Sequence, residues 1–231
     1  MPRFTCSRCT GAEKSSSTIL STDSTAYSAG FICAVNESLA IPFENMLLRS
    51  PGIKNNRGVQ QQGERNLNRL ARGEFSKCRP CVILSSTTIV RGNSVSEPIM
   101  NTRVCLMGTF GNGQTPYEQL PRICQHFAIP IRPNPRSGPD GLHIHVSPEM
   151  TNPNQYIIGI PIYTKRIIER TWPGPVGDPS SPPMVYTLDQ ESLVELDEAI
   201  QERISQWDGM CRADPGYAVE CAVEYRVRCI A

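Results

Sequence analysis

Residues 77–84 read KCRPCVIL and residues 103–110 read RVCLMGTF, and these two apolar runs decide how the chain folds. Each run has the length and composition of a buried strand. A charged or polar residue stands near one end of each, Arg79 in the first and Thr109 in the second. If the two strands pair, we expect both side chains to face one surface. A guanidinium beside a hydroxyl is suited to binding or attacking a phosphate.

Three further short strands are expected downstream, over residues 127–131, 142–146 and 156–164. Stretches rich in Gly, Pro and Asn separate them, and the chain's 20 prolines and 17 glycines predict many turns. Five short strands joined by irregular loops favour a compact, mainly antiparallel β-barrel that begins at Gly73.

The clearest helix of the sequence is expected over residues 188–207, after a proline-rich connector at 171–183. Its acidic residues lie mostly away from its apolar residues. The spacing Ser192-x-x-Glu195 is that of a capping box at the start of a helix. A start one turn earlier, within 187–190, is the alternative. The sequence predicts an amphipathic helix packed by one apolar stripe, formed by Leu193, Leu196, Ile200, Ile204 and Trp207.

Both ends of the chain are expected to lie outside this domain of residues 73–208. Residues 1–72 are predicted to be a largely disordered arm, rich in Ser and Thr and then basic over 49–72. Such a basic segment either holds a polyanion by counterion release or serves as a solvated linker. From Tyr217 to Cys229 apolar and polar residues alternate, which predicts a strand-like extension over 209–231.

Charge and hydropathy exclude several classes of protein. The formal net charge of +1 gives no global signature for nucleic acid or a membrane surface. No apolar run approaches the ~20 residues that a membrane-spanning helix needs, and the N-terminus lacks the apolar core of a secretory signal. We therefore expect no membrane partner and a cytoplasmic or nuclear location. The ten cysteines are then expected to be mainly reduced.

The Gly73-Glu74 pair followed by KCRPCVILS (77–85) resembles the opening of the MazF/PemK (Kid) toxin family, in which a Gly-Glu turn and an Arg-Pro pair precede an apolar strand. The strand end 106–109 is similar to the family's strand that closes in Thr or Ser, and 188–200 is similar to its C-terminal helix. The match runs from about Gly73 to Trp207 with long insertions. It implies a mainly β fold with α, an SH3-like small antiparallel β-barrel.

The resemblance also implies a metal-independent endoribonuclease that cuts single-stranded RNA with the substrate's own 2′-hydroxyl as nucleophile. Arg79 would stabilise the charge of the phosphorane, and Thr109 would orient the phosphate by a hydrogen bond. Lys77 and Phe110 are expected to contact the substrate. A homodimer is implied and no cofactor. The alternative is a catalytically inactive barrel that serves as a protein- or RNA-binding module.

Metal chemistry is the remaining possibility that the sequence raises. The pairs Cys6-x-x-Cys9 and Cys78-x-x-Cys81 together have enough thiols for zinc, but the second pair lies within an expected strand. His143 and His145 stand two apart on another expected strand and so face the same side, where a metal pair competes with a solvated surface. No carboxylate completes a familiar motif, and no metal site is predicted.

Overall fold

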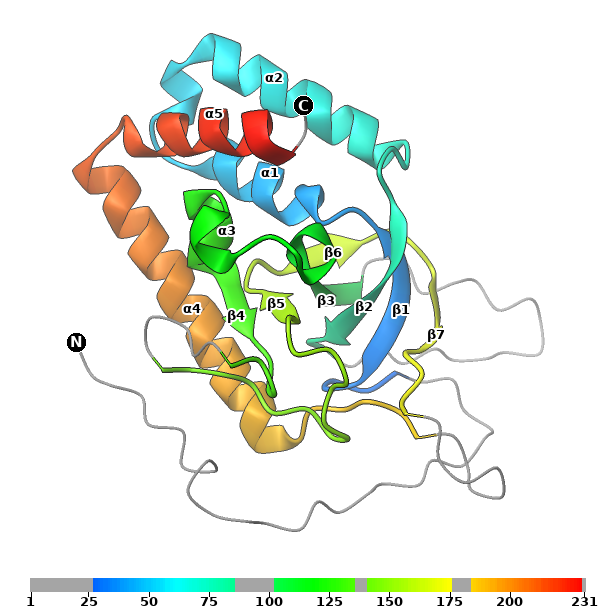
Figure 1. Cartoon of the computed structure of the whole chain (residues 1–231). Coiled ribbons are helices and arrows are strands. Elements are labelled where there is room, and N and C mark those ends of the chain that lie inside the picture. Colours follow the sequence, from blue (N-terminus) through cyan, green and yellow to red (C-terminus); the bar gives the residue numbers. More distant parts are fainter. Residues whose placement is uncertain (1–26, 86–101, 136–140, 176–183, 230–231) are drawn as a thin grey trace.

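The computed structural model describes residues 27–85, 102–135, 141–175 and 184–229. In these parts of the chain a seven-stranded antiparallel sheet forms the centre of the molecule (Figure 1). Hydrogen-bonded neighbours follow the order β4-β5-β3-β2-β1-β7, and β6 also pairs with β3. The strands are β1 Ile32–Glu37, β2 Lys77–Ile83, β3 Thr102–Gly108, β4 Ala128–Pro130, β5 Tyr156–Ile158, β6 Ile162–Thr164 and β7 Ile168–Thr171.

Helices cover this sheet in two groups. In Figure 1, α1, α2 and α5 gather at one end of the molecule, and α4 runs past α3 and β4. The helices are α1 Ala40–Arg49, α2 Arg57–Ala71, α3 Arg122–Phe127, α4 Gln190–Ala213 and α5 Tyr217–Cys229, with 3-10 turns η2 Ile53–Asn55, η3 Phe110–Gly113 and η4 Tyr117–Gln119. None of the helices in the described ranges has both the length and the apolar character needed to cross a membrane.

The sheet is strongly curled. β6 pairs with β3 and β7 pairs with β1, so a flat sheet would hold β6 and β7 four strand spacings, roughly 19 Å, apart. The four peptide units from Thr164 to Ile168 span at most about 14 Å. The curl brings the Thr164 hydroxyl to Glu37, to which it donates a 2.7 Å hydrogen bond. The concave face encloses a core of Cys33, Val35, Cys81, Ile83, Val104, Leu106, Ile162 and Ile168.

The strand order does not close, so the expected barrel is replaced by a mixed α/β fold around a curled, open sheet. The predicted strands at 77–84 and 103–110 are present as β2 and β3, and they pair. The segment 142–146 forms only an isolated bridge from Ile144 to Ile131. The segment 156–164 is interrupted between β5 and β6. Gly159 there lies so close to Ile129 that a Cβ would be 2.9 Å from its Cδ1, and Pro161 has no N–H to donate.

The N-terminal arm differs most from expectation, because residues 32–71 form β1, α1 and α2. β1 lies inside the sheet between β2 and β7. α1 buries Phe43, Met46 and Leu47 at helical spacing. α2 buries Gly63, Asn66 and Leu70, which are mostly small or polar, so its apolar stripe is thin and the helix is hard to recognise in the sequence. The remainder of the arm, residues 1–26, lies outside the described residues.

The C-terminal segment is helix α5 and not the expected strand. Its buried residues are Ala218, Cys221, Ala222 and Tyr225, which recur at spacings of three and four. Val223 and Val227, which the alternating pattern assigned to the same face as Cys221, are 52% and 67% exposed. The alternation misleads because two of the inward positions are alanines, which the pattern counted with the polar residues.

The amphipathic helix expected over 188–207 is present as α4 and continues to Ala213. It starts at the earlier alternative, because the Asp189 side chain caps it by accepting a 2.9 Å hydrogen bond from the Ser192 N–H. Leu196, Ile200 and Trp207 are fully buried. Part of the proline-rich connector before it, residues 176–183, lies outside the described residues.

A buried ion pair joins the two segments that the sequence misassigned. Arg226 of α5 donates to both carboxylate oxygens of Glu44 in α1, at 3.0 and 2.7 Å, and to the Val59 carbonyl of α2 at 2.8 Å. Asn66 of α2 donates to the same carboxylate at 2.7 Å. The Glu44 side chain is fully buried and that of Arg226 is 11% exposed. One charge pair therefore connects three helices.

We expect Arg226→Ala to lower the free energy of unfolding by about 3–5 kcal/mol, because it leaves the Glu44 carboxylate buried without its counter-charge. Urea denaturation followed by circular dichroism measures this loss. The matched control is Arg72→Ala, which removes an arginine from an exposed pair with Glu74 and is expected to change the free energy of unfolding little. Equal losses in the two variants would contradict the structural role of the buried pair.

Two lysine substitutions in α5 distinguish the helix from the strand pattern. Ala222→Lys places a charge in the core and is expected to cost more than about 3 kcal/mol. Val223→Lys stays at the surface and is expected to change stability by no more than about 0.5 kcal/mol. Thermal unfolding of both variants checks the order. The reverse order would indicate the alternating strand.

Candidate functional site

Arg79 lies on the concave side of the sheet with a largely unsatisfied guanidinium. It stands opposite Val35 of β1 and alternates with Cys81 and Ile83 of the concave core. Its Nε donates a 3.0 Å hydrogen bond to the Glu37 carbonyl, and the described part of the chain provides it with no carboxylate partner. Burial lowers the pKa of this guanidinium, which stays charged at neutral pH. Among the described residues Arg79 is therefore a half-buried cation without an ion-paired carboxylate.

Thr109 belongs to the opposite face of the sheet. In β3, Val104 and Leu106 contribute to the concave core, whereas Cys105 and Met107 pack into the core on the other side. Thr109 follows Gly108 in extended conformation, with φ −115° and ψ 133°, and so continues the series of Cys105 and Met107. Although β2 and β3 pair as expected, the structure does not bring Arg79 and Thr109 to one surface.

Lys77, Arg79 and Phe110 lie at a common end of the sheet. Because β2 and β3 are antiparallel, β2 begins where β3 ends, next to the first residue of η3, Phe110. Lys77 is exposed. Gly108 packs against Leu39, which follows β1 at this same end, and a Cβ there would lie 2.6 Å from the leucine. The sheet end thus combines two cations with an aromatic ring.

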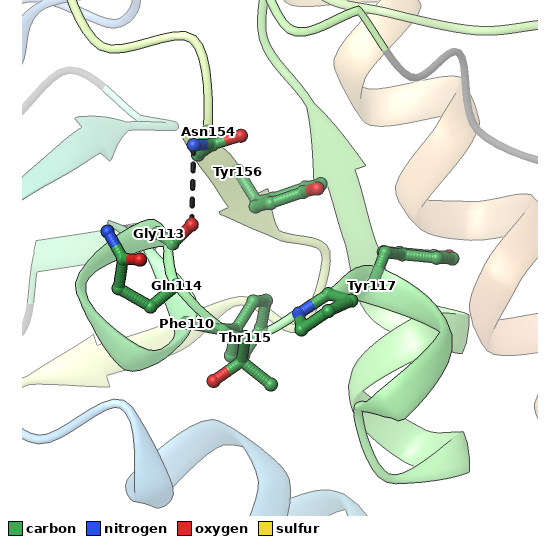
Figure 2. Close-up of a pocket in the computed structure, with 8 residues that line it drawn as sticks. Phe110, Gly113, Gln114, Thr115, Tyr117, Asn154 and Tyr156 are labelled. Carbon is green, nitrogen blue, oxygen red and sulfur yellow. Dashed lines mark hydrogen bonds between the residues drawn. The ribbon is translucent and has the colours of Figure 1, made fainter.

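Phe110 is part of an aromatic pocket of about 200 Å³ (Figure 2). The rings of Tyr117 and Tyr156 stack at 6.0 Å with 25° between their planes, and Phe110 is 5.7 Å from Tyr156. The Asn154 amide donates a 3.4 Å hydrogen bond to the Gly113 carbonyl across the pocket rim. The lining is uncharged and consists of Phe110, Gly113, Gln114, Thr115, Pro116, Tyr117, Asn154 and Tyr156. It suits a flat, neutral ring with polar edges.

Only Phe110 of this pocket was predicted to bind a ligand. Tyr117 comes from η4 and Tyr156 from the start of β5, where Tyr156 stands opposite Gly108 of β3. The pairing of β5 with β3 and the turns η3 and η4 that follow β3 place these rings together. No local motif connects them in the sequence, because the three aromatic residues come from different turns and strands.

A basic surface lies next to Lys77, where α2 ends and β2 begins. Phe75 is 57% exposed with φ +60°, and the Arg69 guanidinium lies 5.3 Å from its ring centroid. The Arg166 guanidinium, from the turn between β6 and β7, donates to the Ala71 carbonyl at 3.0 Å. We call this the basic surface and define it by Arg69, Arg72, Phe75, Lys77, Lys165 and Arg166.

Glu74 is the acid within the basic surface. It accepts a 2.7 Å hydrogen bond from Arg69 and one of 3.2 Å from Arg72, and the bond from Arg69 is the main cause of its lowered pKa. One carboxylate cannot neutralise five cations. The surface therefore keeps a positive charge around an exposed aromatic ring.

The candidate metal ligands do not form a complete site. The rings of His143 and His145 lie 5.1 Å apart. Cys78 is exposed while Cys81 is buried in the concave core, so the two thiols of this pair point apart. Within the described ranges no three His, Cys, Asp or Glu side chains gather in a way that could hold a metal ion. Cys6 and Cys9 lie outside the described residues.

Phe75 holds a backbone conformation with φ +60° that costs an L-residue about 1–2 kcal/mol, so we expect its side chain to serve the surface and not stability. Phe75→Gly and Phe75→Ala both remove the ring, and only glycine relieves the backbone. We expect the glycine variant to be more stable than the alanine variant by about 1 kcal/mol, as measured by urea denaturation. An alanine variant of equal or greater stability would refute the strained conformation.

No family model, no curated protein and no solved structure matches this chain. Membership of the MazF/PemK family, ribonuclease activity and the homodimer therefore stay predictions from the resemblance at residues 73–85, 106–109 and 188–200. The function must be argued from the geometry of the sheet end, the aromatic pocket and the basic surface.

Proposed function

We propose that this protein is a single-stranded RNA-binding module. The observation that carries the proposal is the half-buried guanidinium of Arg79, which has no ion pair among the described residues, at the same sheet end as the neutral aromatic pocket of Phe110, Tyr117 and Tyr156. Unpaired bases of single-stranded RNA stack on aromatic rings, and its phosphates accept hydrogen bonds from arginine. One end of the sheet thus offers aromatic rings for the base of a nucleotide and a guanidinium for its phosphate.

An anionic ligand would also offset the solvation energy that Arg79 loses on burial. Burying the Arg79 guanidinium costs solvation, and its single hydrogen bond to the Glu37 carbonyl uses only Nε. A phosphate in contact with the two terminal NH₂ groups would restore charge-assisted hydrogen bonds of the bidentate kind. The adjacent Lys77 adds attraction for the next phosphate.

The basic surface extends this binding path. It continues from Lys77 through Phe75 to the arginines at the end of α2 and in the turn between β6 and β7. Its charge favours a polyanion longer than one nucleotide, because the gain from counterion release grows with each phosphate contacted. The exposed ring of Phe75 offers a second stacking position.

An SH3-like architecture is part of the same proposal. The five strands β6-β3-β2-β1-β7 curl around one core, which supports this architecture even though the sheet stays open. Small curled sheets of this kind bind ligands with the loops at one end of their strands. Cleavage through Arg79 and Thr109 together has no such support, since the two residues belong to opposite faces. Binding without that chemistry is the function that fits best.

Binding is tested with a fluorescein-labelled mixed-sequence single-stranded RNA in EDTA, followed by fluorescence anisotropy. We expect Arg79→Gln and Phe110→Leu each to weaken binding about tenfold, through a lost phosphate contact and a lost stacking contact. Arg212→Gln removes one exposed positive charge from the last turn of α4 and is the matched control, expected to bind as the wild type does. Affinity is expected to fall as salt rises.

The same reactions reveal cleavage when the RNA is run on a denaturing gel. Intact RNA with unchanged binding by Thr109→Val agrees with a binding module. RNA cleaved in EDTA by the wild type, but by neither Arg79→Gln nor Thr109→Val, would overturn the proposal in favour of the endoribonuclease. Absence of measurable RNA binding at low salt would also refute it.

A further inference from the structure

The C-terminal half of α5 is fastened along α3. Arg122 of α3 donates to Glu224 at 3.0 Å and to Glu220 at 3.3 Å. One turn further along α5, Arg228 donates a 3.0 Å hydrogen bond to the Gln119 carbonyl in η4, just before α3. These contacts hold α5 against α3, and Cys229, the last residue of α5, interacts with Cys124 of α3.

Cys124 and Cys229 are interacting thiols with unequal surroundings. Cys124, a residue of α3, is buried among apolar residues, and Cys229 is exposed. The neighbouring Cys124 thiol is the main reason that the pKa of Cys229 is lowered, and Arg228 acts in the same direction against burial and Glu224. The pKa of Cys124 is raised, mainly by burial. The exposed sulfur is the more reactive thiolate of the two.

The other described cysteines lack this combination. Cys33, Cys81, Cys105, Cys211 and Cys221 are buried, and burial raises the pKa of each. Cys78 is exposed like Cys229, but it has no thiol beside it among the described residues. Cys78 therefore provides a control within the same chain.

We propose that Cys229 and Cys124 are an oxidation site for peroxides, which closes to a reversible disulfide between α5 and α3. The inference is independent of RNA binding, since it rests on two helices that carry neither Arg79 nor Phe110. An exposed thiolate is the nucleophile and a buried neighbouring thiol resolves the product, which is the arrangement that protects a cysteine from over-oxidation.

The chemistry balances with one hydrogen peroxide. The Cys229 thiolate attacks one peroxide oxygen, the O–O bond breaks, and a sulfenic acid forms while hydroxide takes up a proton and leaves as water. The Cys124 sulfur then attacks the Cys229 sulfur, the S–O bond breaks and the S–S bond forms. The Cys124 proton and the departing hydroxide form a second water. Two thiols are oxidised and one peroxide is reduced to two waters.

The disulfide would tighten the segment that supports the aromatic pocket. Arg228 already holds Gln119 of η4, and Tyr117 of the pocket lies in the same turn. A covalent link one residue beyond Arg228 removes the freedom of the α5 end to separate from this turn. Oxidation is therefore expected to raise the thermal stability of the helical end of the molecule, in a manner that a thiol reductant reverses.

The test treats the full chain with hydrogen peroxide, blocks the remaining thiols and maps the disulfides by mass spectrometry after trypsin digestion without reductant. The expected product is the linked pair of peptides 123–136 and 229–231, which dithiothreitol separates, from protein that still runs as a monomer on a non-reducing gel. Peptide mapping is needed because eight cysteines besides this pair are present in the sequence. Linkage between two chains, or no linkage of these peptides, would overturn the proposal.

Two variants separate the roles of the two sulfurs. Cys124→Ala keeps the exposed thiolate without its resolving partner, so dimedone is expected to trap a sulfenic acid at Cys229 at least about fivefold more than at Cys78. Cys78→Ser is the matched control and is expected to form the disulfide as the wild type does. Equal labelling of Cys78 and Cys229 would refute the proposed reactivity. If Cys124→Ala does not fold, peptide mapping of the wild type and of Cys78→Ser decides.

Discussion

The helical end of this molecule depends on one buried ion pair, Glu44 with Arg226. The Glu44 carboxylate has no access to water, so its charge is tolerable only while Arg226 and Asn66 hold it. Since these residues come from α1, α2 and α5, the solvation demand of one carboxylate fixes three helices relative to one another. A second polar link, from the Trp207 indole to the Ser50 hydroxyl at 2.8 Å, attaches α4 to the end of α1.

That arrangement also determines where the candidate site lies. α1 follows β1 almost directly, so the docking of α1 fixes Leu39 above Gly108 at the end of β3. The chain then leaves β3 through Phe110 toward the turn that carries Tyr117. The curl of the sheet also shapes the site, because it buries Arg79 beside β1 and leaves Lys77 exposed. The aromatic pocket and the two cations are thus consequences of how helices and sheet meet at one end.

The sequence was informative where burial and local pattern agree. β2 and β3 each contain a continuous apolar run, and α4 has a continuous stripe with a capped start, so each could be recognised without tertiary information. α2 and α5 could not, because the residues they bury are largely glycine, alanine, asparagine and cysteine. Their helical form is fixed by close packing and by the Glu44–Arg226 pair, which connects residues 182 positions apart.

The candidate site was also predictable from the sequence only in part. Arg79, Lys77 and Phe110 were identifiable as polar or aromatic residues at strand ends, and all three lie at one end of the sheet. The relative position of Arg79 and Thr109 could not be identified from the sequence. It depends on the register of β2 and β3, and a shift of one residue exchanges the two faces. Tyr156 reaches the pocket through the pairing of β5 with β3, and Tyr117 through the turn η4. No spacing in the sequence encodes this proximity.

The position of β1 has a consequence for how the protein is made. β1 sits inside the sheet, and its second neighbour, β7, pairs Ala34 with Arg170, far along the chain. Until β7 has been synthesised, one edge of β1 has no strand to pair with. Such long-range pairing slows folding and leaves a strand edge open to other chains during synthesis. The nascent protein therefore has a long interval in which a chaperone, or a neighbouring nascent chain, competes for the strand that the finished molecule encloses.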